Sequence, residues 1–471
     1  MKSSALPFYI LAIVAVSCNA VPSKKPIALH PENPHYFTYE DSAAVLITSG
    51  EHYGAVLNLD FDYVTYLNEL SKNRLNLTRT FTGAYVEPVG AFKIERNTMA
   101  PPPGSFICPW ARSETPGYAN GGNKFDLTKW DEKYFARLKD FMKEAEKRKI
   151  IVELALFCPF YEDTQWVLSP MNPINNINGI GPADRMQVYT LDKSSGLLEL
   201  QDALVVKIVN ELKDYSNLIY EICNEPYFGG VTMEWQHHIA SLINNQEKEF
   251  AHKHLISQNI ANEKLKIENP HPAVSVFNFH YAHPPVAVAQ NFHLNKVIGD
   301  NETGFAGNAD STYRREGWEF ILAGGALYNN LDYSFTADHE SGSFQYPETQ
   351  PGGGTPAFRQ QLSFLKDFLN GFDYVNMKPD STIIEREDTT QRKGQVLAKE
   401  GDQYAIYVSG KGPMTLKLNI PAGTYTVEFM DPLTGRYEGK QRAESNGSIV
   451  LTTPAYPEDV AIKIAGENQT K

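Results

Sequence analysis

The chain has 471 residues, with 43 Lys and Arg against 56 Asp and Glu, so its formal net charge is -13. This excess of acidic residues argues against nucleic acid as a partner, because phosphate binding needs clustered cations. A hydrophobic fraction of 42% excludes a disordered chain and is enough for a large buried core.

The N-terminus has the pattern of an export signal. Lys2 precedes an apolar run over residues 6–16, which is too short to span a bilayer. Two cleavage sites fit. Residues 15–18 resemble a bacterial lipoprotein box, which would make Cys18 a lipid anchor, and this interpretation is favoured; Ala20 would instead end an ordinary signal peptide. We therefore expect residues 1–20 to be a signal and the protein to be exported, to the periplasm, the outer membrane or the exterior of a bacterium.

After the signal, short apolar runs alternate with polar loops and with amphipathic stretches at helical spacing. This alternation is typical of parallel strands joined by helices. The candidate strands are centred on residues 44–49, 75–81, 150–157, 218–223, 255–260, 274–279, 296–299 and 326–333. Eight such units predict an α/β fold, a (β/α)8 TIM barrel over residues 21–380.

Two connections, residues 83–127 and 159–199, are longer than a barrel needs and are rich in Gly, Pro, Asn and aromatic residues. Both follow predicted strands, so they should lie over the carboxyl ends of the barrel strands, where such barrels place their chemistry. We expect them to form the walls of a substrate cleft. Apolar faces of sugars stack on aromatic rings, so aromatic residues in the predicted rim loops and strand ends are candidates for stacking, with Trp110 and Trp166 preferred. The set is Tyr85, Trp110, Tyr118, Trp166, Tyr227, Phe228, Trp235 and Tyr333.

From about residue 381 to the end, short alternating strands are separated by turns. This pattern predicts an antiparallel β-sandwich accessory domain over residues 381–471.

Carboxylates end two of the predicted strands. The fourth strand runs into Asn224-Glu225-Pro226, and the proline stops the strand so that Glu225 lies at its carboxyl rim. The seventh strand runs into Asp300-Asn301-Glu302. Strands four and seven of a barrel lie nearly opposite one another. Glu225 and Glu302 could therefore approach within the about 5–5.5 Å that retaining glycosidic cleavage requires. Asp300 is the rival on the seventh strand, and Glu302 is preferred because it stands at the strand end.

With these motifs the chain resembles the clan A glycoside hydrolases, the cellulase-like (β/α)8 retaining enzymes. The resemblance implies that Asn224 and Glu225 are the Asn-Glu pair that supplies the acid/base, and that Glu302 is the nucleophile. It also implies that Arg79 on strand two supports the nucleophile and that His280 on strand six lies near it. The chain departs from the family in two places: the usual His-x-Tyr of strand six reads His280-Tyr281-Ala282-His283, and no Trp ends strand eight.

Glu51 and His52 follow the first strand and are predicted to hydrogen-bond the substrate. A cation at Arg79 would keep Glu302 ionised while Glu225 holds its proton, which assigns the two glutamates different roles. An alternative is that Arg79 only pairs with a rim acid in a structural network. The sequence has no His-Glu-x-x-His, dinucleotide or P-loop motif, so neither a metal nor a cofactor is expected.

The sequence therefore predicts an exported retaining glycoside hydrolase that cleaves β-glycosidic bonds in a poly- or oligosaccharide. Two other functions remain open at this point. One is a non-catalytic glycan-binding lipoprotein with a degenerate barrel, and the other is an inverting hydrolase, whose carboxyl groups would lie about 6.5–9.5 Å apart.

Overall fold

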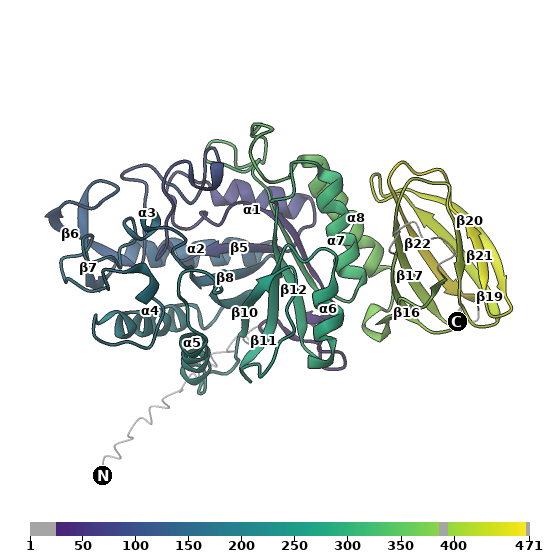
Figure 1. Ribbon diagram of the computed structural model, residues 1–471, viewed down its shortest axis with the longest axis horizontal. Coiled ribbons are helices and arrows are strands. Elements are labelled where there is room, and N and C mark those ends of the chain that lie inside the picture. Colours follow the sequence, from purple (N-terminus) through teal and green to yellow (C-terminus); the bar gives the residue numbers. More distant parts are fainter. Residues whose placement is uncertain (1–24, 386–393, 468–471) are drawn as a thin grey trace, which may run out of the picture.

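The computed structural model describes residues 25–385 and 394–467. The predicted signal and Cys18 lie outside these residues. Within them, no helix has both the length and the apolar character that a membrane span requires. The molecule is elongated, with a barrel at one end and a β-sandwich at the other (Figure 1).

Eight parallel strands form one sheet in the order β4-β13-β12-β11-β10-β9-β8-β5, which confirms the predicted barrel. The two end strands also meet, because the Asn76 N–H donates to the Ile47 carbonyl at 3.3 Å. The strands are β4 (Leu46–Gly50), β5 (Leu77–Phe81), β8 (Ile151–Phe157), β9 (Leu218–Cys223), β10 (Leu255–Asn262), β11 (Val274–His280), β12 (Val297–Thr303) and β13 (Leu327–Leu331). All eight predicted strands are present, and β12 runs past the predicted end at residue 299 to include Glu302.

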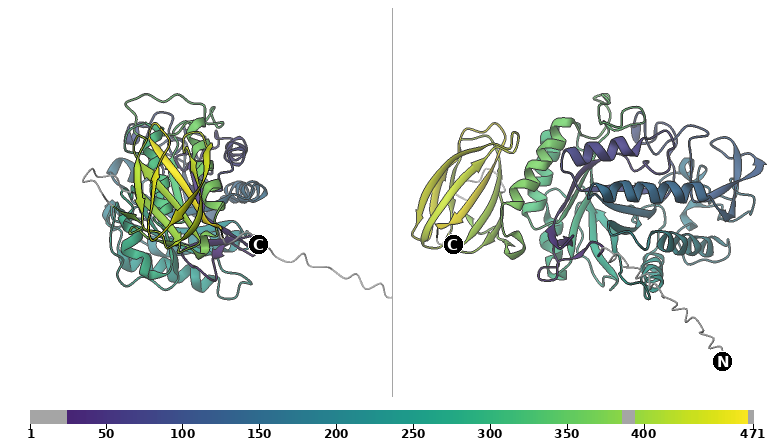
Figure 2. Two further views of the ribbon diagram at one scale, coloured as in Figure 1. Left: turned by 90° about the vertical axis from the view of Figure 1, so that its right-hand side faces the viewer. Right: turned by 180° about the vertical axis from the view of Figure 1, so that it is seen from behind.

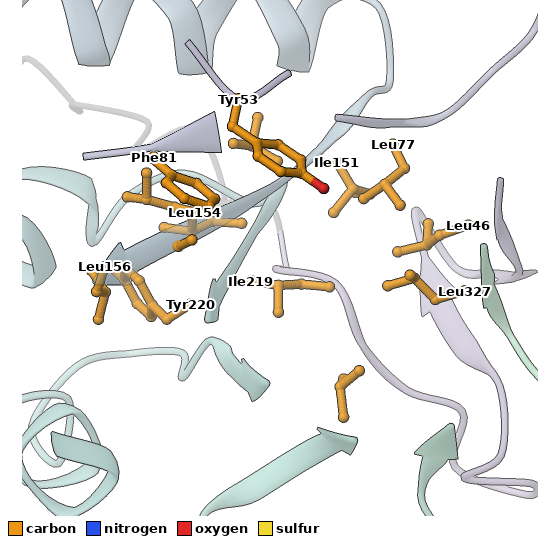
Figure 3. Close-up of a cluster of buried hydrophobic side chains, with 14 of the residues drawn as sticks. Leu46, Tyr53, Leu77, Phe81, Ile151, Leu154, Leu156, Ile219, Tyr220 and Leu327 are labelled. Carbon is orange, nitrogen blue, oxygen red and sulfur yellow. The ribbon is translucent and has the colours of Figure 1, made fainter. Parts of the chain in front are cut away.

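The barrel interior is layered. Leu77, Ile151 and Ile219 lie near the amino ends of adjacent strands and are buried (Figure 3). Two residues further along each strand, the same side of the sheet carries side chains that are charged and buried, namely Arg79, Glu153 and Glu221. An apolar floor thus lies beneath a charged layer that includes Arg79, and Glu225 and Glu302 stand at or near the carboxyl ends of their strands.

Helices cover the barrel: α1 (Tyr63–Lys72), α2 (Glu132–Lys147), α4 (Leu197–Leu212), α5 (Met233–Gln246), α6 (Val286–Asn291), α7 (Asp310–Leu322) and α8 (Pro356–Asn370). At the start of α8, Thr355 Oγ1 accepts from the Phe358 N–H at 3.0 Å, and Pro356 occupies the first turn, where its missing N–H costs nothing.

The two long insertions contain regular secondary structure. The first contains the hairpin β6 (Trp110–Pro116) and β7 (Asn123–Trp130), and the second contains the short helix α3 (Asp163–Trp166). They pack on each other, because the Phe125 N–H donates to the Asn175 carbonyl at 2.8 Å. The hairpin lies at the end of the molecule opposite the sandwich (Figures 1 and 2).

The C-terminal region consists of two antiparallel sheets that share an apolar core, as predicted for a β-sandwich. The strands are β14 (Lys378–Pro379), β16 (Gly394–Lys399), β17 (Gln403–Ser409), β22 (Asp459–Gly466), β19 (Gly423–Met430) and β20 (Tyr437–Ser445) in one sheet and β15 (Ile384–Glu385), β18 (Thr415–Leu418) and β21 (Ile449–Thr452) in the other. The sandwich packs on α7 and α8 (Figures 1 and 2). Arg314 of α7 donates to Asp459 at 3.0 Å, and Trp318 stacks on Tyr407.

Three short strands precede the barrel and form a small antiparallel sheet. They are β1 (Ala28–Leu29), β2 (Phe37–Tyr39) and β3 (Ser42–Ala44).

Candidate active site

Glu225 stands two residues beyond the end of β9, at the carboxyl rim of the barrel. Its backbone has a φ of +34°, a left-handed conformation that costs energy for any residue other than glycine. Its buried carboxylate accepts a hydrogen bond from the Tyr161 hydroxyl at 2.6 Å and another from the Tyr227 hydroxyl at 3.1 Å. The backbone is therefore strained where the predicted acid/base is held.

Glu302 lies near the end of β12 and is also buried. The Tyr53 hydroxyl donates to its Oε2 at 2.7 Å, and the Tyr281 hydroxyl donates to its Oε1 at 2.6 Å. Both tyrosines have left-handed backbones, with φ of +61° and +53°. Arg79 Nη1 adds a third donor, 3.3 Å from Oε2.

These neighbours decide the charge of Glu302. Burial by itself would raise the pKa of Glu302. His280, the Arg79 guanidinium, and the hydroxyl groups of Tyr281 and Tyr53 oppose that effect and hold the pKa below its usual value. Glu302 is therefore ionised at neutral pH.

His280, at the end of β11, lies between the two glutamates. Its Nδ1 is 3.1 Å from Glu225 Oε1 and 3.5 Å from Glu302 Oε1. The Asn259 amide nitrogen lies 2.8 Å from His280 Nε2, so the other ring nitrogen, Nδ1, faces the carboxylates. The structure therefore places His280 beside both glutamates, whereas the sequence predicted a position near Glu302.

Glu225, His280 and Glu302 each offer one donor atom, and these atoms all lie within 4.8 Å of one another. The cluster could in principle hold a cation. However, the carboxylates already accept bonds from Tyr161, Tyr281 and the Arg79 guanidinium, and that guanidinium would repel a metal ion. The arrangement is better suited to two facing carboxyl groups than to a metal centre.

Arg79 connects the charged layer of the barrel to the site. It donates to Glu221 from Nε at 2.9 Å and from Nη2 at 2.5 Å, and Nη2 also donates to Asn224 Oδ1 at 2.6 Å. Arg79 thus makes both the predicted contact with Glu302 and the structural ion pair that was the alternative. Sequence reasoning missed Glu221, although a carboxylate inside an apolar strand needs a buried partner.

A pocket of about 350 Å³ opens above the two glutamates. Glu87 and Phe92 from the first insertion and Tyr161 from the second help to form its walls, as the position of the insertions predicted. The other lining residues are His52, Tyr53, Phe81, Cys158, Asn224, Glu225, Phe228, Asn262, Tyr281, Glu302 and Phe305.

Of the two residues after the first strand that were predicted to bind the substrate, His52 and Glu51, one lies at the pocket and the other does not. His52 lines the pocket, with Nε2 3.2 Å from the Glu87 carboxylate. Glu51 does not. Its carboxylate accepts from the Gly54 N–H at 3.0 Å and the Ala55 N–H at 2.9 Å, so it caps the backbone of the loop instead of facing a substrate. The prediction for Glu51 was wrong, and Glu87, which had no motif, was missed.

The aromatic predictions for the insertions were also wrong. Trp110 is 0% exposed, and Trp166 is 3% exposed and packs on Phe160, with ring centroids 4.8 Å apart. Tyr333 is 3% exposed and packs behind His52, with ring centroids 5.5 Å apart. None of the three offers a ring face to a sugar.

Asp300, the rival carboxylate, is buried away from the pocket, and its Oδ2 accepts from the Ala282 N–H at 3.2 Å. This contact holds the turn that carries Tyr281.

Comparison with known proteins agrees with this geometry. Residues 109–312 match the family model for cellulase (glycosyl hydrolase family 5), and this segment contains both Glu225 and Glu302. No curated protein sequence matches the chain.

Several solved structures are similar in fold. A putative glycoside hydrolase from Bacteroides vulgatus ATCC 8482 has a TM-score of 0.65 and 13% identity, covering 94% of this chain and 82% of that chain. A glycoside hydrolase family 5 protein from the same organism has a TM-score of 0.63 and 13% identity, covering 94% of each chain. A family 5 mannosidase from Rhizomucor miehei has a TM-score of 0.50 and 12% identity, covering 74% of this chain and 99% of that chain. The family match over residues 109–312, the barrel and the two facing glutamates together make the chain similar to the cellulase-like (β/α)8 glycoside hydrolases.

Proposed function

We propose that the protein is a retaining glycoside hydrolase that cleaves β-glycosidic bonds in a carbohydrate substrate by double displacement. The observation that carries this proposal is the distance between the two glutamates, whose nearest donor atoms lie within 4.8 Å of each other. Retaining enzymes hold their carboxyl groups about 5–5.5 Å apart, whereas inverting enzymes leave about 6.5–9.5 Å for a water molecule.

In the first step, a carboxylate oxygen of Glu302 attacks the anomeric carbon. The bond from that carbon to the glycosidic oxygen breaks, and Glu225 gives its proton to the departing oxygen. In the second step, Glu225 takes a proton from water, the water oxygen attacks the anomeric carbon, and the bond to Glu302 breaks. The sugar leaves with its original anomeric configuration, and both glutamates return to their starting states.

The surroundings of Glu302 support its role as nucleophile. Tyr53, Tyr281 and Arg79 donate to it and hold it ionised in one orientation, with a pKa below the usual value. Because the orientation of Glu302 is already fixed, less entropy is lost when it attacks the anomeric carbon, and the activation free energy is lower.

Recognition of the sugar on the Glu302 side falls to His52 and Glu87. Both line the pocket, and their polar atoms could exchange hydrogen bonds with sugar hydroxyl groups. The proposal includes export through the signal within residues 1–20, with cleavage directly before Cys18 and Cys18 as the lipid-bearing residue. The sequence pattern described above supports this part of the proposal.

The test compares Glu225→Gln and Glu302→Gln with the wild-type protein on a panel of β-linked polysaccharides and oligosaccharides, with release of reducing ends as the readout. We expect each substitution to lower the rate by about 10²–10⁴-fold, since each removes a group that acts in the reaction. Glu438→Gln, an exposed substitution in the sandwich, is the matched control. Full activity of either active-site variant would contradict the proposal.

A further inference from the structure

The exposed phenylalanines among the described residues lie at one place. Among the described residues, three phenylalanines are more than a third exposed: Phe92 at 39%, Phe228 at 43% and Phe305 at 40%. All three line the pocket above Glu225 and Glu302. Exposed apolar rings cost free energy in water, and a cluster of them at one pocket indicates an apolar ligand surface.

Two of these rings stand on the Glu225 side of the pocket. The Tyr161 ring lies between them, 5.5 Å from the Phe92 ring and 5.6 Å from the Phe228 ring, measured between centroids. Tyr161 is also the residue that donates to Glu225 Oε2. Phe92 and Phe228 therefore flank the carboxyl group that would protonate the departing oxygen.

Polar groups on this side already have partners. The Tyr161 hydroxyl donates to Glu225 and accepts from Asn224 Nδ2. The Tyr227 hydroxyl contacts both Glu225 and Asn262 Oδ1. A group placed here would meet ring faces beside polar groups that already have partners, and on the Glu302 side His52 and Glu87 are likewise paired with each other.

We propose that the leaving-group side of the pocket accepts an apolar aglycone, so that the substrate class is the β-glycosides of hydrophobic alcohols or phenols. This inference rests on the proposed function, because the assignment of Glu225 as acid/base is what places the leaving group between Phe92 and Phe228. Phenylalanine contributes area without a polar atom, so an alkyl or aryl group buries apolar surface here over all of its atoms, whereas a sugar buries only the apolar face of its ring.

The test uses methyl, butyl and octyl β-glycosides of one sugar, chosen as the sugar that is released fastest from a panel of 4-nitrophenyl β-glycosides. Butanol and octanol are leaving groups of nearly equal basicity, so a difference in kcat/KM between their glycosides reports contact with the chain. We expect the octyl glycoside to exceed the butyl glycoside in kcat/KM on the order of tenfold, as expected if about half of the added chain is buried. The kcat/KM of the octyl glycoside should also exceed that of a disaccharide from which the same sugar is released.

Phe92→Ala and Phe228→Ala should each reduce the octyl-to-butyl ratio of kcat/KM to about threefold or less, because each removes one of the two rings on the Glu225 side of the pocket. Tyr437→Ala is the matched control, since Tyr437 is an exposed residue of β20, a strand of the sandwich, which lies apart from the barrel (Figure 1). It should leave the ratio unchanged.

Calorimetry on Glu302→Gln provides a readout without turnover, with octyl and butyl β-D-glucoside as the probes, the octyl glucoside below its micellar concentration. Tighter binding of the octyl probe is expected, and equal affinity would contradict the inference. If the octyl-to-butyl ratio of kcat/KM is near one while activity still depends on Glu225 and Glu302, the inference is overturned and the proposed function stands. Activity that survives Glu302→Gln, or no cleavage of any β-glycoside, would overturn the proposed function, and the calorimetry would still decide whether the apolar site exists.

Discussion

Tyr161 donates a hydrogen bond of 2.6 Å to Glu225, and its own oxygen accepts a bond of 2.8 Å from Asn224 Nδ2. Because the Asn224 amide points at the Tyr161 oxygen, the tyrosine proton is directed to the glutamate. Asn224 accepts in turn from Arg79, which donates to Glu302. A continuous chain of hydrogen bonds therefore joins the two glutamates.

Tyr161→Phe breaks this chain at its last link. We expect kcat/KM to fall on the order of tenfold for substrates with poor leaving groups, because Glu225 loses the contact that orients it for proton transfer. For 2,4-dinitrophenyl glycosides, whose leaving group needs no proton, the bond-breaking step should be almost unchanged. Steady-state kinetics on both substrate types would check this, and an equal loss on both would indicate a structural defect instead.

Arg79 is buried with Glu221 and Glu302, so its removal leaves two carboxylates without a cation. Arg79→Met should lower the free energy of unfolding by about 3–5 kcal/mol. Arg79→Met/Glu221→Gln should recover part of that loss but not the activity, since Glu302 still lacks one donor. Denaturant unfolding of the single and double variants measures the coupling. Additive effects of the two substitutions would rule out the ion pair as a stabilising unit.

Glu153 gives the stability a pH dependence. Burial and the neighbouring Glu221 raise the pKa of Glu153 to about 7, against the opposing effects of Arg79 and the hydrogen bonds from Asn301 and Ser257. Since the folded state holds this proton more tightly than the unfolded state, stability from this group is full below pH 4.5, the ordinary value, and is lost as the pH rises toward 7. We expect the fall in Tm between about pH 5 and pH 7 to be smaller in Glu153→Gln than in the wild-type protein. Parallel curves would contradict this.

Glu87→Gln tests recognition on the Glu302 side. A carboxylate makes stronger hydrogen bonds to sugar hydroxyl groups than an amide does, so its loss should raise KM by about tenfold with a smaller change in kcat. Glu438→Gln, exposed in the sandwich, serves as the control. A change confined to kcat would instead place Glu87 in the chemical step.

The barrel was predictable because each strand is a compact apolar run between polar loops. Glu225 and Glu302 were predictable because each stands at the end of such a run, and because strands four and seven face each other. Both predictions depend on the order of the strands, which follows from the order of the apolar runs along the sequence.

The hydrogen-bond partners of the two glutamates were not predictable in the same way. Tyr53 and Tyr281 reach Glu302 because their backbones adopt left-handed conformations, and no residue pattern marks those positions. Tyr161 lies in an insertion whose path depends on packing. Trp110 and Trp166 are buried, although the position of the insertions alone would place them at the surface.

The stereochemistry of the first product tests the double displacement most directly. Proton NMR during hydrolysis of a β-glycoside shows which anomer appears before mutarotation mixes the two. We expect the β anomer first, because a glycosyl group passed through Glu302 is inverted twice. Early appearance of the α anomer would mean a single displacement by water, which contradicts a nucleophilic role for Glu302.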